Sequence, residues 1–340
     1  MTKRQLTKQQ RRRIEQNQVE ASTEIITQQG CSGEKDHDNT GLEKYGVVIA
    51  SYGSQVDVEA TDDSGKFVRR CHLRANLPTI VSGDKITWKD HGAHGVVIAQ
   101  HPRDSELCRP DNRGKLRPVA ANIDRIAIII APYPEPHSNL IDRYLVASEH
   151  QAIQPLIVLN KADLIGKENT EHLASLAKIY SALGYDYFLV SATSGSGIKK
   201  FEAYLNNHTS VFVGQSGVGK SSLINLLQPQ ANMPVGPLSV GKEKGTHTTT
   251  ISKLFHLAGG GVLIDSPGIR EFALTHLSQE KVINGFIDFR PYLGYCKFRD
   301  CNHDKEIGCC LLAAVADKKV LMTRLHNYRQ IILSQQSTRF

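Results

Sequence analysis

The chain has 340 residues, of which 40% are hydrophobic and 22% are charged. This length exceeds what one hydrophobic core usually serves and predicts two or three domains, while the composition excludes a wholly disordered or fibrous protein. Lys and Arg outnumber Asp and Glu by 41 to 34, a surplus that suits a nucleic-acid partner but also fits a solvated basic face. No aliphatic run approaches the roughly 20 residues of a membrane span, so we expect a soluble, cytoplasmic protein with no membrane partner.

The sequence pattern of residues 1–103 predicts a tail followed by a small β domain. Residues 1–44 contain few large apolar side chains and predict a disordered basic tail. Residues 45–103 contain five short alternating runs separated by turn signals, which predict a closed OB-type β-barrel, the commonest small barrel that binds nucleic acid. One predicted strand carries four side chains that could face a phosphate backbone or simply line a solvent-facing edge: Arg69, Arg70, His72 and Arg74.

Residues 104–277 carry continuous apolar runs that alternate with helical periodicity, the pattern of a parallel sheet wrapped by helices. The predicted strands are Ile123–Ala131, Pro155–Leu159, Tyr187–Ser191, Ser210–Val213, Ile251–Leu257 and Gly261–Asp265. The predicted helices are Ser138–His150, Glu168–Leu183, Ile198–Leu205 and Gly219–Leu227. This segment therefore predicts an α/β nucleotide-binding domain. Residues 278–340 predict a mostly helical domain around a cysteine cluster, with helical spacing of apolar residues over 311–332.

A phosphate-binding loop stands at the centre of this segment. The sequence GQSGVGKS fits G-x-x-x-x-G-K-[ST] at every fixed position, follows an apolar strand and opens a helix, which is the context the motif requires. Backbone N–H groups would wrap a β-phosphate, Lys220 would reach the β- and γ-phosphates, and Ser221 would ligate Mg²⁺. The predicted phosphate site comprises Gly214, Gln215, Ser216, Gly217, Val218, Gly219, Lys220, Ser221 and Ser222.

Three further motifs follow predicted strands, where the ligand loops of a parallel sheet belong. Asn160-Lys161-Ala162-Asp163 resembles the guanine-specificity motif of GTPases, in which the Asp carboxylate accepts from guanine N1 and N2. Ser191-Ala192 matches the dipeptide whose backbone N–H meets guanine O6. Asp265-Ser266-Pro267-Gly268 resembles the D-x-x-G element, in which Asp265 holds Mg²⁺ through water and the Gly268 N–H senses the γ-phosphate.

Residues 246–250, Thr-His-Thr-Thr-Thr, lie between the phosphate loop and D-x-x-G and resemble switch I. We expect Thr249 to ligate Mg²⁺ when the γ-phosphate is present. In the Ras pattern a glutamine after D-x-x-G orients the attacking water, but this chain has Ile269 there, and an apolar side chain cannot orient water. His247 is therefore the candidate for that role, against the alternative of a solvated loop histidine.

The order of these motifs differs from that of an ordinary GTPase. The guanine motifs precede the phosphate loop here, whereas an ordinary GTPase begins with the phosphate loop. Because the termini of compact domains often lie close together, rejoining them and cutting elsewhere preserves every strand-end loop. The order therefore predicts a circularly permuted GTPase domain.

Four of the seven cysteines lie between residues 296 and 310. Cys296, Cys301, His303 and Cys309 offer three thiolates and one imidazole, the ligand set of a closed, structural zinc site. Cys310 could take the place of Cys309, and unpaired buried cysteines are the alternative to a metal site.

Taken together, these features closely resemble the RsgA (YjeQ) family over about residues 40–330. They are the permuted order, the phosphate and guanine motifs, the run 247–250, Ile269 and the Cys/Cys/His/Cys cluster. The resemblance implies a bacterial GTPase with an OB barrel, a permuted GTPase domain and a C-terminal zinc domain. It implies a monomer that binds 16S rRNA of the immature small (30S) ribosomal subunit, assists late maturation and leaves after GTP hydrolysis. A GTPase serving tRNA or another RNA is the alternative function, and a nucleic-acid-binding module with a merely dimerising G domain is a third.

Overall fold

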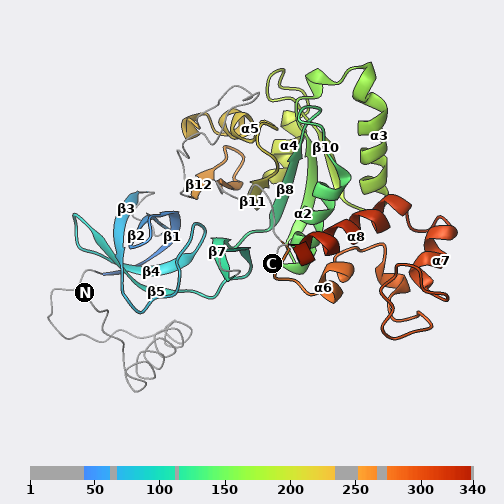
Figure 1. The fold of residues 1–340 in the computed structure, drawn as a ribbon. Helices are drawn as coiled ribbons and strands as arrows, with labels where there is room; N and C mark the ends of the chain where they lie inside the picture. The colour runs from blue at the N-terminus through green and yellow to red at the C-terminus, as the bar shows by residue number, and fades with distance from the viewer. Residues whose placement is uncertain (1–41, 62–66, 112–114, 234–251, 266–273, 338–340) are drawn as a thin grey trace. The chain divides into compact units, whose positions relative to one another are not determined.

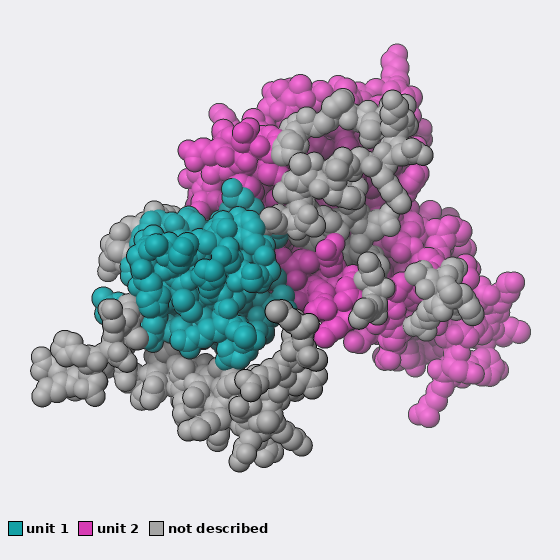
Figure 2. All heavy atoms as spheres, turned by 60° about the vertical axis from the view of Figure 1, so that its left-hand side comes forward, with its two compact units in different colours: residues 1–104, 251–254 teal, residues 105–250, 255–340 magenta. Residues whose placement is uncertain are grey.

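The protein is described by a computed structural model that covers residues 42–61, 67–111, 115–233, 252–265 and 274–337 (Figure 1). Its contacts divide the chain into two compact units, coloured teal and magenta in Figure 2. Unit 1 comprises residues 1–104 and 251–254, and unit 2 comprises residues 105–250 and 255–340. The predicted boundary at residue 277 lies inside unit 2 and stays a prediction. Strand β1 begins at Glu43, so the last two residues of the predicted tail belong to a strand.

Unit 1 contains a five-stranded barrel. Its strands are β1 (Glu43–Ser51), β2 (Gln55–Ala60), β3 (Val68–Leu73), β4 (Lys85–Asp90) and β5 (Gly95–Gln100). They follow the order β1-β2-β3-β5-β4, and β4 pairs back with β1 to close the barrel. The pair β3–β5 is parallel and the others are antiparallel. Trp88 fills the centre, and a Cβ on Gly95 would lie 2.4 Å from Cys71 Sγ, so glycine is needed for this close packing. The predicted OB-type barrel is confirmed.

Unit 2 is built on a parallel sheet with helices on both faces. The strands are β8 (Arg125–Ile130), β9 (Gln154–Leu159), β10 (Asp186–Leu189), β11 (Thr209–Val213) and β13 (Val262–Asp265), in the order β10-β9-β8-β11-β13. The helices are α2 (Ser138–His150), α3 (Lys167–Ala182), α4 (Ile198–Leu205) and α5 (Lys220–Leu227). The short strand β12 spans Lys253–His256, and only its last two residues belong to unit 2. Single 3-10 turns cover Ala162–Leu164 and Pro229–Ala231.

The alternation of side chains along β8 explains the layers. Ala127 and Ile129 join a buried cluster with residues of α4 and α5 on one face of the sheet. Ile126 and Ile128 are also fully buried and point to the opposite face, where α2 packs on β8 and β9. Burial on both faces accounts for the continuous apolar run in the sequence. The strand ends then present their loops along one edge, which positions the site described below.

Unit 2 also contains a hairpin that the sequence pattern did not predict. Strands β6 (Glu106–Pro110) and β7 (Leu116–Ala121) pair antiparallel in a separate two-stranded sheet. The alternation of apolar and polar residues that normally marks a strand is interrupted here by Pro110, Pro118 and the charged side chains between them. Local pattern therefore gives no sign of this hairpin.

The C-terminal segment contains α6 (Gln279–Asn284), a 3-10 turn (Arg290–Tyr292), α7 (Cys310–Ala316) and α8 (Met322–Ser337). The helical spacing over 311–332 therefore belongs to two helices, which are separated where Lys318 takes a left-handed conformation with φ of 59°. Within the described residues, every helix is too short or too polar to cross a bilayer.

Helix α8 packs on α2 through a buried polar network. Arg324 of α8 is 2% exposed and pairs with Asp142 of α2, which is fully buried, and with Asp288 at 2.7 Å. Asp142 also accepts hydrogen bonds from Tyr180 of α3 at 2.8 Å and from Asn327 of α8 at 2.7 Å. The buried carboxylate of α2 is thus satisfied by two other helices, as a buried charge requires. The C-terminal segment is held against the α/β domain by these contacts.

Candidate nucleotide-binding site and metal centre

The phosphate loop begins where β11 ends and leads into α5. Gly214 has φ of 139°, and a Cβ there would lie 2.2 Å from the carbonyl oxygen of Ile129 in β8. Gly219 has φ of 91°, and its Cβ would lie 2.4 Å from Asn160 Nδ2. Side chains at either end would therefore collide with neighbouring structure as well as strain the backbone. These glycines let the loop pack between β8 and the predicted guanine motif.

Lys220 and Asp265 interact electrostatically beside this loop. The Lys220 ammonium donates to the carbonyl oxygens of Gly214 at 2.7 Å and Gln215 at 2.6 Å. Asp265 ends β13, the parallel neighbour of β11. Burial raises the pKa of the Asp265 carboxyl, and the positive charge of Lys220 opposes that rise. Ser221 follows Lys220 in the first turn of α5, so a hydroxyl and a carboxylate, both oxygen ligands that Mg²⁺ prefers, belong to adjacent strand-end loops.

Asn160 joins three of the predicted motifs. Its side chain is buried, and Nδ2 donates to the carbonyl oxygen of Val218 at 2.9 Å. Its Oδ1 accepts from the Ala192 backbone N–H at 3.2 Å. One amide therefore ties the guanine motif to both the phosphate loop and the Ser191-Ala192 loop. The parallel sheet brings these loops to one edge, and Asn160 fixes their spacing.

Asp163 stands at the exposed rim of this arrangement, in the 3-10 turn after β9. Ser191 donates its hydroxyl to Asp163 Oδ1, and the Ser194 backbone N–H donates to the Ser191 hydroxyl oxygen at 3.0 Å. The Ala162 N–H donates to the carbonyl oxygen of Val190 at 3.0 Å, which connects the same two loops through the backbone. The carboxylate is thus oriented by its neighbours before any base is bound.

Lys161 spans from the guanine motif to the phosphate loop, a contact that the motif pattern did not specify. Its ammonium donates to the carbonyl oxygens of Gly217 at 2.6 Å and Tyr133 at 2.9 Å. Burial lowers the pKa of Lys161, and nearby Asp163 opposes that shift. Tyr133 follows the end of β8, so the strand-end rule could have singled it out as a neighbour of the site. The three predicted residues His247, Thr249 and Gly268 lie outside the described residues.

The cysteine cluster has the dimensions of a tetrahedral metal site. The Nδ1 atom of His303 lies 3.6, 3.7 and 3.3 Å from the sulfur atoms of Cys296, Cys301 and Cys309. Zinc bonds of about 2.3 Å to sulfur and about 2.0 Å to nitrogen would place tetrahedral ligand atoms roughly 3.5 to 3.8 Å apart. The Cys296 and Cys309 sulfurs are 3.9 Å apart, and the four ligand atoms all lie within 4.8 Å of one another. The donor set and its spacing fit one zinc ion.

Cys310 lies outside this group of four. Its thiol donates to the carbonyl oxygen of Tyr295 at 2.8 Å, while its backbone N–H points to Cys296 Sγ at 3.4 Å. The Leu312 N–H similarly points to Cys309 Sγ at 3.5 Å. The structure thus favours Cys309 over Cys310 as the fourth ligand.

Two charged side chains organise the loop around the cluster. Glu306 accepts from the backbone N–H groups of Asn302 at 2.8 Å and Asp304 at 2.7 Å, and backbone hydrogen bonds, led by its own N–H, lower the pKa of Glu306 to about 2. Arg329 of α8 donates to the carbonyl oxygens of His303 at 2.8 Å and Asp304 at 2.7 Å. The cluster is therefore attached to the helix that packs on the α/β domain.

Comparison with known proteins agrees with this architecture. The sequence model of the RsgA GTPase family matches residues 100–275. A small ribosomal subunit biogenesis GTPase RsgA of Pseudomonas aeruginosa strain PAO1 is 52% identical over 340 residues, which cover 99% of both chains. The protein of the same name from Azotobacter vinelandii is 53% identical over 337 residues, with 98% of both chains covered.

Two crystal structures share the fold. YjeQ from Thermotoga maritima aligns with a TM-score of 0.71 at 28% identity and covers 87% of this chain and 99% of its own. YloQ, described as a circularly permuted GTPase, aligns with a TM-score of 0.68 at 27% identity and covers 89% of this chain and 99% of its own. These matches confirm the predicted combination of barrel, circularly permuted GTPase domain and C-terminal helices.

Proposed function

The chain belongs to the RsgA GTPase family and is a GTP hydrolase, and from this premise we propose that it binds the immature small ribosomal subunit and assists its late maturation. The observation that carries the proposal is full-length similarity to proteins named for small-subunit biogenesis. The proposal includes contact with 16S rRNA, a monomeric state, a cytoplasmic location and release after GTP hydrolysis.

The outer face of the barrel supports an RNA partner. Arg70 and His72 alternate with the buried Cys71 along β3, so both point outward. The Arg70 guanidinium lies 4.2 Å from the centre of the Tyr52 ring and also pairs with Asp57. Exposed aromatic and cationic groups on OB strands suit stacked bases and phosphates. Because Asp57 neutralises Arg70 in the free protein, an RNA phosphate would have to compete for this guanidinium.

GTP binding follows from the loops around β11. Backbone N–H groups of residues 214–219 and the ammonium of Lys220 would hold the β- and γ-phosphates. Ser221 and Asp265 would hold Mg²⁺, the latter through water, and the ion would supply further neutralisation of phosphate charge. Asp163 would accept from guanine N1 and N2, and the Ser191-Ala192 loop would meet guanine O6. Adenine lacks that donor pair, so this arrangement selects guanine.

Hydrolysis adds roles for residues outside the described part of the chain. In the proposed mechanism His247 positions the attacking water, Thr249 completes the Mg²⁺ ligands, and the Gly268 N–H contacts the γ-phosphate. Lys220 stabilises the charge that spreads over the transferring phosphoryl group. Catalysis is then mostly positioning and charge neutralisation.

Zinc would have a structural role. Cys296, Cys301, His303 and Cys309 supply four protein ligands, so no open position remains for a substrate. The ion would close the loop that Arg329 attaches to α8. Its proposed contribution is a folded C-terminal segment that presents a stable surface.

The decisive experiment compares GTP hydrolysis by the full chain alone and with isolated small subunits, tRNA or duplex DNA. We expect a marked increase in kcat with small subunits and none with the other two. Lys220→Ala serves as the control, since it should abolish hydrolysis with every partner. Stimulation by tRNA instead would establish the alternative function, and the absence of stimulation by small subunits would refute the proposal.

A further inference from the structure

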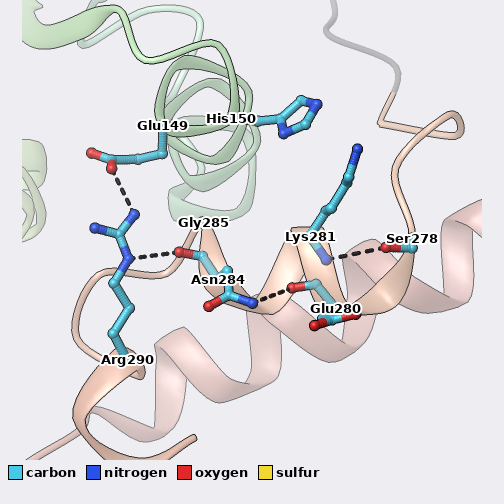
Figure 3. Close-up of a pocket in the computed structure, with 8 residues that line it drawn as sticks. All are labelled: Glu149, His150, Ser278, Glu280, Lys281, Asn284, Gly285 and Arg290. Carbon is cyan, nitrogen blue, oxygen red and sulfur yellow. Dashed lines mark hydrogen bonds and ion pairs between the residues drawn. The ribbon is translucent and has the colours of Figure 1, made fainter.

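A pocket outside both sites described above lies between the C-terminal end of α2 and helix α6 (Figure 3). It has a volume of about 380 Å³. Glu149 and His150 line it from α2, Lys281 and Asn284 from α6, and Arg290 from the 3-10 turn that follows. None of these side chains is part of the nucleotide site or the cysteine cluster, so the pocket needs its own explanation.

One wall of the pocket is fixed by an ion pair. Arg290 Nη2 lies 2.7 Å from Glu149 Oε2, and Arg290 Nε donates to the Asn284 carbonyl oxygen at 2.8 Å. These bonds connect α2, α6 and the following turn, and both are drawn in Figure 3. The negative charge of Glu149 is therefore paired with Arg290 within this wall. Glu280 of α6 also lines the pocket, and Figure 3 shows its side chain directed away from the Lys281 ammonium and the His150 ring.

The opposite side carries two basic side chains that approach each other. Figure 3 shows His150 and Lys281 directed toward the same space from α2 and α6. Within the described part of the chain, Lys281 makes no ion pair, and both side chains are exposed. Partial burial and then the positive charge of Lys281 lower the pKa of His150. An anion bound between two such donors would be stabilised by both of them.

We propose that Lys281 and His150 bind one backbone phosphate of RNA at this pocket. A small ligand is usually enclosed over most of its surface, whereas these donors stand at an open rim that can accept one phosphate of a longer chain. The C-terminal segment carries a basic surplus, because residues 278–340 contain 10 Lys and Arg against 6 Asp and Glu. The inference rests on the proposed RNA partner and adds a contact at the junction of α2 and α6.

The test uses the full chain with a non-hydrolysable GTP analogue and isolated small subunits at several salt concentrations. Each phosphate contact contributes about one to the slope of log affinity against log salt. Lys281→Ala should therefore reduce that slope by about 1 and weaken binding several-fold at low salt, while GTP hydrolysis without subunits stays unchanged. Lys178→Ala on α3 is the matched control and should leave the slope unchanged. Equal slopes for wild type and Lys281→Ala would overturn the inference.

A second measurement separates the sources of phosphate and removes dependence on the subunit. The ring signals of His150, assigned by comparison with His150→Gln, are followed by NMR during titration with a single-stranded RNA oligomer or with inorganic phosphate. We expect the RNA to shift these signals at far lower concentration than inorganic phosphate. Saturation by inorganic phosphate with no response to RNA would reject an RNA site. If wild type fails to bind subunits but its His150 responds to RNA, the proposed function fails while the pocket remains.

Discussion

The proposed guanine site and the cysteine cluster obtain their geometry in different ways. The guanine site is formed by loops that leave a buried parallel sheet, and Asn160 connects three of those loops by hydrogen bonds of 2.9 to 3.4 Å. The cluster lies in residues 293–309, all described, which contain turns and no helix or strand. The first site inherits its shape from the core of the domain. The second depends on its four candidate ligand side chains and on the hydrogen bonds of Glu306 and Arg329.

This difference predicts whether a substitution changes nucleotide binding or local folding. Removing a ligand group from the guanine site should weaken nucleotide binding but leave the fold intact, because the sheet still positions the loops. Removing a ligand from the cluster should unfold the local chain, because a stretch of this length without secondary structure is otherwise ordered mainly by the hydrogen bonds of Glu306 and Arg329.

The largest effect is expected for Cys301→Ser. Loss of one thiolate should release the zinc ion and unfold residues 293–309, since structural zinc contributes on the order of 10 kcal/mol to folding. Metal analysis should find one zinc per chain in the wild type and none in the variant, together with new protease cleavage in this stretch. Cys310→Ser is the matched control, because the Cys310 thiol bonds to the Tyr295 carbonyl instead of joining the cluster, and it should retain zinc. A wild-type protein free of zinc would contradict the account of this site.

A smaller but still large effect on stability is expected at the contact between α2 and α8. Arg324→Met removes the partner of the buried Asp142 and should lower the free energy of unfolding by about 3 to 5 kcal/mol, the usual cost of an uncompensated buried charge. Denaturant unfolding measures this change. Lys319→Ala breaks a pair with Asp317 in which both side chains are 61% exposed, so it should cost less than about 1 kcal/mol. Equal midpoints for the two variants would show that the α2–α8 network contributes little.

The smallest effect on structure is expected for His247→Ala. This substitution tests whether a residue of the nucleotide site can be changed without loss of the fold. A water-positioning group acts in the transition state, so kcat should fall roughly 10² to 10⁴ fold with GTP affinity nearly unchanged. Single-turnover hydrolysis and equilibrium nucleotide binding measure the two quantities separately. His256→Ala on β12 is a suitable control histidine. Unchanged kcat in His247→Ala would transfer the role to the ribosomal partner or to backbone groups.

Local sequence pattern anticipated the elements whose burial is regular. Helices Ser138–His150 and Ile198–Leu205 have the bounds expected from their periodicity, and the parallel strands differ from expectation by a few residues at their ends. Because parallel strands end at one edge, the motifs that follow β9, β10 and β11 could be predicted to meet, and Asn160 does join them. The grouping of Cys296, Cys301 and Cys309 around His303 was predictable for another reason, since these residues lie close together in the chain.

Contacts between distant residues were not predictable. The partners Arg324 and Asp142 are separated by 182 positions, and neither leaves a local pattern that names the other. The Lys161 bond to the Tyr133 carbonyl depends on how two loops bend, which residue type alone does not specify. The break between α7 and α8 falls at Lys318, where no glycine or proline announces it. Each of these features is set by tertiary packing.

The most direct test of the central claim, that this chain reads guanine through residues 160–163, is the nucleotide preference of Asp163→Asn. The amide presents a donor suited to the carbonyl at C2 of xanthine, and it loses the charge that accepts from guanine N1 and N2. Two hydrogen bonds to a charged group contribute about 1.5 to 3 kcal/mol each, so GTP affinity should fall roughly 10² to 10⁴ fold while xanthosine triphosphate becomes the preferred ligand and is hydrolysed. A variant that still prefers GTP would contradict the claim and remove Asp163 from the base site.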